Sequence, residues 1–145
     1  MKILVINGVN LNMLGIREPG IYGNRTLDDI NAYIKDHCDK IYVDVDFFQS
    51  NIEGEIVNMI HKAHFDYDGV VLNAGAFTHY SYAIHDAISS ISKPVIEVHI
   101  SNISARDEFR SKSVISEVCK GCIFGLGIHG YTLAIDYLNS TYECK

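Results

Sequence analysis

The sequence predicts an α/β domain of the flavodoxin-like type, a doubly wound five-stranded parallel sheet with helices on both faces. Apolar runs of strand length recur five times along the 145 residues, and patterns of helical periodicity lie between them. The third run, residues 69–73, is short and almost continuously apolar, as expected for a strand covered on both faces. The length fits one domain, so we expect residues 1–145 to form a single unit.

The strands are expected at the five apolar runs, residues 2–7, 41–49, 69–73, 94–101 and 122–125. The helices are expected between and after them, at residues 26–34, 53–64, 78–91, 111–120 and 128–142. Thr26 is a capping residue, and Leu27, Ile30 and Ile34 after it form an apolar stripe of helical spacing. Thr78 occupies the corresponding capping position of the third helix.

A long connection, residues 7–23, leaves the first strand and reaches no helix signal before Thr26. Loops of this length in compact domains are more often lids or binding loops than plain connectors, so we expect a lid over about residues 8–25. The loop carries Arg17 and Tyr22. A cation beside a phenol favours the phenolate, which makes Tyr22 a candidate base.

Composition excludes several classes of protein. The net charge of −6 and the pI near 5.5 argue against a nucleic-acid partner. No apolar run is long enough to cross a bilayer, and Asn7 and Gly8 interrupt the first apolar run too early for a signal peptide, so we expect a cytoplasmic protein without membrane contact. The arginines lie in two short segments, 17–25 and 106–110, which indicates either a small-anion site or exposed surface charge.

Three patterns resemble cofactor or metal sites but lack the necessary context. Cys119 and Cys122 form a C-x-x-C without further ligands, so we expect structural thiols in a reducing compartment. Residues 125–130 match G-x-G-x-x-G, but no strand and no acidic residue follow at the required distance. Asp44 and Asp46 share a strand face without a third ligand. We therefore expect no metal and no cofactor.

Ligands of doubly wound sheets bind beyond the carboxyl ends of the strands, where the strand order reverses. Glu97 and His99 lie on the same side of the fourth strand there, because side chains alternate with period two. A carboxylate that orients a histidine suits a general acid, and a purely structural pair is the alternative. Asn73 and His79 follow the third strand, where an amide, an imidazole and the free donors of a helix start can reach the same crevice.

These segments together resemble one enzyme family. The loop NGVNLNMLGIREPGIYG, the turn LNAGAFTHYS, the strand IEVHISN with RDEFR after it, and the ending GLGIHGYTLAI are similar to type II 3-dehydroquinate dehydratase over nearly the whole chain. One departure is Val9, where the family commonly has proline. The resemblance implies loss of water from 3-dehydroquinate to give 3-dehydroshikimate in the shikimate pathway, without metal, cofactor or Schiff base.

The resemblance also implies roles for individual residues. Tyr22 is the expected base and Arg17 lowers its pKa, Asn10 holds the enolate, and His99, oriented by Glu97, protonates the leaving hydroxyl. The expected substrate contacts are the backbone donors of Ile100 and Ser101 for the carboxylate, Asn73, His79 and Arg110 for the ring hydroxyls, Arg106 as a further charged position, and Asp86 from a neighbouring subunit. The family forms homododecamers, arranged as a tetramer of trimers.

Two other classes of function stay open from the residues. A flavodoxin-like electron carrier needs a Ser/Thr-rich phosphate loop after the first strand, whereas this loop holds Asn, Arg and Tyr. A non-catalytic small-anion-binding domain with the same crevice differs from the enzyme only in turnover. The presence of Tyr22, Arg17 and His99 together favours the enzyme.

Overall fold

The computed structural model of the chain describes residues 1–143, apart from the side chains of Tyr22 and Glu143. All five strands are parallel and lie in the order β2-β1-β3-β4-β5. Their bounds are β1 (Lys2–Asn7), β2 (Asp44–Gln49), β3 (Gly69–Asn73), β4 (Val95–His99) and β5 (Gly121–Phe124). This order is that of flavodoxin-like sheets and confirms the predicted fold class, with β1 and β3 at the reversal point.

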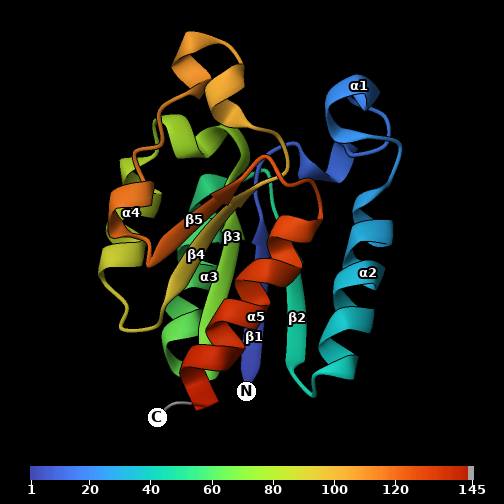
Figure 1. The fold of residues 1–145 in the computed structure, drawn as a ribbon. Coiled ribbons are helices and arrows are strands. Elements are labelled where there is room, and N and C mark those ends of the chain that lie inside the picture. The colour runs from blue at the N-terminus through green and yellow to red at the C-terminus, as the bar shows by residue number, and fades with distance from the viewer. Residues whose placement is uncertain (144–145) are drawn as a thin grey trace.

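Helices cover both faces of the sheet, as Figure 1 shows. Helices α2 (Leu27–Lys40) and α5 (His129–Glu143) pack on one face, and α3 (Glu53–Asp66) and α4 (Tyr82–Ser89) pack on the other. The alternation along β1 explains the two layers, because Ile3 and Val5 belong to the core under α2 and α5 while Leu4 and Ile6 belong to the core under α3 and α4.

The start of α2 confirms the predicted cap. The Thr26 hydroxyl accepts a hydrogen bond from the Asp29 backbone N–H at 3.2 Å, and the Asp29 carboxylate accepts one from the Thr26 N–H at 2.9 Å. This reciprocal pair is a capping box and satisfies two backbone donors at the helix start. The first turn of α2 therefore begins at the residue that the sequence indicates.

Two predicted helices are wrong in part or whole. The segment 111–120 contains only the short 3₁₀ helix η5 (Ser116–Val118), and the connection from β4 to β5 otherwise holds η3 (Ile103–Ala105) and η4 (Glu108–Arg110). Thr78 caps no helix: it lies in η2 (Gly75–His79), and Ser81 caps α4 instead by accepting from the Ile84 N–H at 3.1 Å. In both places hydroxyl side chains bond to partners outside a helix, which competes with helical hydrogen bonding.

The predicted lid is not structureless. It contains the 3₁₀ turn η1 (Leu11–Met13) and the one-turn helix α1 (Pro19–Tyr22). Figure 1 shows α1 and the η3–η4 segment at the same end of the molecule, opposite the N-terminus. The lid and the β4–β5 connection therefore lie together beyond the carboxyl ends of the strands.

Candidate active site

A pocket opens at the reversal point of the sheet and encloses about 550 Å³, part of it open to solvent. Its walls come from the lid, from the ends of β3 and β4, and from the β4–β5 connection. The lining residues that matter for chemistry are Asn10, Arg17, Asn73, His79, His99, Ile100, Ser101, Arg106 and Arg110. The structure therefore brings together most of the predicted site residues from four separate segments.

At the end of β4, Glu97 is fully buried and His99 is 6% exposed. The His99 Nε2–H donates to Glu97 Oε1 at 2.8 Å, because an ionised carboxylate has only acceptors. The Nδ1 nitrogen of His99 is thereby left for other chemistry. The predicted pairing of these two side chains across one residue of strand is confirmed.

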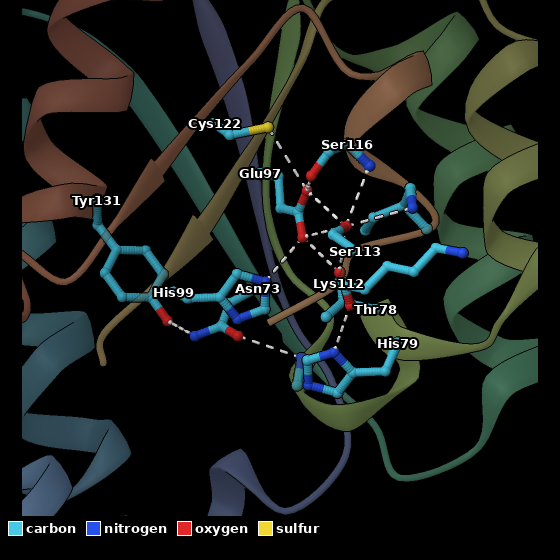
Figure 2. A network of polar contacts seen from close by, with 12 residues as sticks. Asn73, Thr78, His79, Glu97, His99, Lys112, Ser113, Ser116, Cys122 and Tyr131 are labelled. Carbon is cyan, nitrogen blue, oxygen red and sulfur yellow. Dashed lines mark hydrogen bonds and ion pairs between the residues drawn. The ribbon is translucent and has the colours of Figure 1, made fainter. Parts of the chain in front are cut away.

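The Glu97 carboxylate accepts further hydrogen bonds from three hydroxyl groups, as Figure 2 shows. Thr78 donates to Oε1, Ser116 donates to Oε2, and the Ser113 oxygen lies 2.9 Å from Oε1 and 3.0 Å from Oε2. The Cys122 thiol lies 3.5 Å from Oε2. Burial raises the pKa of Glu97, but the bonds from His99, Ser116 and Thr78 outweigh it and hold that pKa below its ordinary value. The carboxylate is therefore held in its charged form.

His79 is held in the other tautomer, with its proton on Nδ1. Its Nδ1–H donates to the Lys112 backbone carbonyl at 2.7 Å, and its ring packs edge-on against Phe109. Burial lowers the pKa of His79, helped by the nearby charges of His99 and Arg110, although the Lys112 bond opposes the shift. Neutral His79 therefore presents Nε2 as an acceptor, which suits a donor hydroxyl on a ligand.

Three arginines make the pocket basic within an acidic protein. Arg106 and Arg110 have side chains that are 15% and 19% exposed, and Arg17 is half-buried on the lid. Glu18 lies between two of them, with Oε2 at 3.4 Å from Arg17 and 3.7 Å from Arg106. Arg110 stacks on Phe109 and forms an ion pair with Asp107 at 3.5 Å. Such a cluster suits a small anion, the class of ligand that the grouping of arginines indicates.

Asn73 is oriented by a buried tyrosine that sequence reasoning missed. The Asn73 Nδ2–H donates to the Tyr131 hydroxyl at 2.8 Å, and Tyr131 donates to Asn7 Oδ1 at 2.6 Å. The other side of the amide, Asn73 Oδ1, accepts from the Gly75 N–H at 3.2 Å. Burial strongly raises the pKa of Tyr131, so its phenol stays neutral and acts as a fixed link between β1 and β3.

The remaining predicted residues are placed as follows. Asn10 adopts a left-handed conformation with φ 66°, and its N–H donates to Asn51 Oδ1 at 2.9 Å. Ile100 and Ser101 follow β4 directly and line the pocket. Tyr22 ends α1, but its side chain lies outside the described residues. Asp86 does not line the pocket; it is on the exposed surface of α4, where it accepts from His85 at 2.8 Å.

Sequence reasoning also missed Thr78, Ser113 and Ser116 as partners of Glu97. Ser113 and Ser116 lie in a serine-rich segment that the apolar pattern assigned to a helix, and the serine content was the available signal. Cys38, Cys119 and Cys122 are free thiols in the structure, and Cys144 lies outside the described residues. Over the described part of the chain, no three His, Cys, Asp or Glu side chains are grouped to hold a metal ion. None of its helices is long and apolar enough to cross a membrane.

The fold and the pocket define a class: an α/β domain with an arginine-lined pocket at the reversal point of a flavodoxin-like sheet, beside an oriented histidine. Comparison with known proteins identifies the family. The protein-family model described as "Dehydroquinase class II" matches residues 1–139, so the chain belongs to the class II dehydroquinase family.

The relatives agree with this assignment. A 3-dehydroquinate dehydratase of Thermotoga neapolitana is 56% identical over 138 residues, which cover 95% of this chain and 94% of the relative. The crystal structure of the type II dehydroquinase from Butyrivibrio crossotus superposes with a TM-score of 0.94 at 53% identity, covering 96% and 97% of the two chains. That from Propionibacterium acnes superposes with 0.93 at 46% identity, covering 96% of each chain.

We expect Glu97→Gln to change how stability depends on pH. The pKa of Glu97 in the folded protein is below the ordinary value of 4.5, so the ionised carboxylate stabilises the fold above that pH, and the contribution is lost as the pH falls through the folded-state pKa. Urea unfolding should show the variant less stable than the parent at pH 7, with the gap narrowing below pH 4.5. Asp36→Asn, at an exposed carboxylate of α2, should follow the parent. A gap that is constant down to pH 3 would contradict this role of the charge.

Proposed function

We propose that the chain is a 3-dehydroquinate dehydratase of type II, a hydro-lyase that converts 3-dehydroquinate to 3-dehydroshikimate in the shikimate pathway. The observation that carries the proposal is the Glu97–His99 pair, because His99 lines a pocket that three arginines also line. Family membership and the relatives named 3-dehydroquinate dehydratase support it. The reaction needs a base, a group that stabilises an enolate, an acid and an anchor for the substrate carboxylate.

The first half of the proposed reaction uses the lid. Tyr22, as phenolate, removes the proton from the carbon next to the ketone, and the electrons of the C–H bond move to the ketone oxygen as an enolate. Arg17 on the same loop favours the phenolate by its positive charge. The side chain of Asn10, which lines the pocket, holds the enolate oxygen.

The second half uses the pair at the end of β4. As the enolate oxygen re-forms the ketone, the electron pair of the enolate double bond shifts to form the conjugated carbon–carbon double bond of the product. The bond from the adjacent carbon to its hydroxyl breaks at the same time, and the hydroxyl leaves as water with a proton from His99. The Glu97 carboxylate holds Nε2, so Nδ1 of His99 is the nitrogen that delivers the proton. The elimination is anti, so the base and the acid act on opposite faces of the substrate. No metal, cofactor or Schiff base takes part.

Binding is assigned to the residues around the pair. The backbone N–H groups of Ile100 and Ser101 take the substrate carboxylate. The ring hydroxyls contact Asn73, His79 and Arg110, and His79 Nε2 accepts from one of them. Arg106, which is largely buried beside Glu18, adds positive charge on the carboxylate side of the pocket.

The larger organisation is also part of the proposal. Residues 1–145 form a single catalytic domain with a lid over about residues 8–25, and the protein is cytoplasmic. Twelve copies assemble as a tetramer of trimers. Asp86 supports this assembly, because its carboxylate is 81% exposed on α4 and does not line the pocket of its own chain, which suits a residue that reaches a neighbour's site. The alternative of a non-catalytic small-anion-binding domain is disfavoured by the oriented acid, which binding does not require.

Turnover of 3-dehydroquinate, followed by the ultraviolet absorbance of the conjugated product, tests the function. In this assay we expect His99→Ala to lower kcat about 100-fold or more, within the usual range for a general acid. His61→Ala, at an exposed histidine of α3, is the matched control and should retain full activity. A loss of less than about tenfold at His99 would assign the pair a structural role.

A second variant examines the base. Tyr22→Phe should abolish turnover while substrate still binds, since the phenol oxygen performs the proton transfer and the ring is retained. The measurements are kcat and substrate affinity by calorimetry. Tyr42→Phe, at a tyrosine that is 94% exposed, should behave as the parent does. Substantial turnover by Tyr22→Phe would mean that another group is the base.

The reaction mode can be separated from imine catalysis. None of the residues that line the described pocket is a lysine, so no amine lies there to attack the ketone. Activity should survive a metal chelator, because the proposed reaction uses no metal. It should also survive borohydride added together with substrate, because no imine forms. Loss of activity with borohydride only when substrate is present, with a matching mass increase on a lysine, would contradict the enolate mechanism.

A further inference from the structure

The segment 112–116 contacts both histidines of the pocket, His79 directly and His99 through Glu97. Ser113 and Ser116 bond to Glu97, and Glu97 in turn holds His99. The Lys112 carbonyl accepts from His79 at 2.7 Å, and the Val114 N–H donates to the Thr78 carbonyl at 2.8 Å. We call residues 112–116 the serine brace. Figure 2 shows the Ser113 and Ser116 side chains directed at Glu97 and the Lys112 carbonyl directed at His79.

The protons of the brace can be assigned. A serine hydroxyl has one proton and accepts through its lone pairs. The Ser113 oxygen accepts from the backbone N–H of Ile115 at 3.3 Å and of Ser116 at 3.1 Å, so its own proton is left to donate. The acceptors around it are Glu97 Oε1 at 2.9 Å, Glu97 Oε2 at 3.0 Å and, at 2.9 Å, the Thr78 hydroxyl, which itself donates to Glu97. The Ser116 hydroxyl donates to Glu97 Oε2. These bonds turn the backbone around Ser113 and direct both hydroxyls at one carboxylate.

The brace also explains the missing helix. A helix over 111–120 would use the N–H groups of Ile115 and Ser116 for helical bonding, and they bond the Ser113 hydroxyl instead. The chain therefore gives up regular structure at the place where it supplies donors to a buried charge. An arrangement that serves only to cover the sheet edge would not require two hydroxyls aimed at Glu97.

We propose that Ser113 and Ser116 are positioning residues that keep the Glu97 carboxylate ionised and turned toward His99, and thereby set the pH range over which His99 acts as the acid. The effect on turnover rests on the proposed function, whereas the effect on Glu97 does not. Neither serine lines the pocket, so both act through Glu97.

Few titratable groups surround Glu97. Those that face it in the described structure are His99 on its own strand, His79 from η2, Cys122 on β5 and Cys119 just before β5. Burial raises the pKa of both thiols, so they are neutral at physiological pH. Besides the hydroxyl donors, His99 is then the titratable neighbour that can stabilise the Glu97 charge. Removing one hydroxyl should therefore act mainly on Glu97.

The test combines Ser116→Ala, Ser116→Thr and Ser140→Ala in the full chain. Ser140 is an exposed serine of α5 whose hydroxyl bonds only its own helix, so its variant is the matched control. The first measurement is the titration of the Glu97 carboxyl by carbon-13 NMR without substrate. The second is the pH dependence of kcat with 3-dehydroquinate.

Ser116→Ala should raise the pKa of Glu97 by about one unit or more, since a hydrogen bond to a charged group is lost. The basic limb of the kcat profile, on which the acid loses its proton, should move up with it, because a carboxylate with one donor fewer holds the proton of His99 more strongly. Ser116→Thr should restore both values, and Ser140→Ala should change neither. Cys122→Ala removes a weaker donor to Glu97 and should give a smaller shift in the same direction, which keeps the test decisive if Ser116→Ala folds poorly. Unchanged Glu97 titration in both variants would overturn the proposal. Absence of turnover in the parent would contradict the proposed function alone.

Discussion

The site and much of the fold around it depend on the hydrogen bonds that stabilise the buried carboxylate of Glu97. An ionised group with no exposed surface is costly unless it is paired and hydrogen-bonded. Its partners come from β4, η2, the β4–β5 connection and β5, so four parts of the chain must assemble before the charge is stabilised. The same contacts fix the ring of His99 through Glu97, so the folded structure already holds the histidine in its oriented position.

A second constraint lies at the reversal point between β1 and β3, where two loops touch. A Cβ on Gly8 would lie 2.4 Å from the Ala74 carbonyl oxygen, and one on Gly75 would lie 2.6 Å from that of Val9. Only glycine permits this approach. The Leu11 N–H donates to the Gly8 carbonyl at 3.3 Å, and Asn10 has φ 66° and ψ 0°, which is the geometry of a type II turn with Val9 at the position that favours proline. The departure at Val9 therefore leaves the turn intact, and Asn51 holds the Asn10 N–H in place.

What the sequence predicts well is local or periodic. The apolar runs give β1 and β3 to the residue, and alternation alone pairs Glu97 with His99. What it does not give depends on contacts between distant residues. Ser113 and Ser116 fit a helical pattern until one knows that a buried carboxylate lies 16 and 19 residues before them. Tyr131 reads as a core residue of α5, and its bonds to Asn7 and Asn73 span 124 and 58 residues.

The charge of the whole chain and the charge of the pocket have opposite signs, and the distances involved explain why both are compatible with an anionic ligand. The net charge of −6 is spread over the surface, where salt screens interactions beyond a Debye length of about 8 Å at physiological ionic strength. Arg106 and Arg110 are mostly buried, so their field inside the pocket is screened much less. Glu18 offsets part of the charge of Arg17 and Arg106, and Asp107 offsets part of that of Arg110. A pocket lined by largely buried arginines therefore suits a small anion whatever the net charge of the surface, and composition alone, which argues against large polyanions, says little about such a ligand.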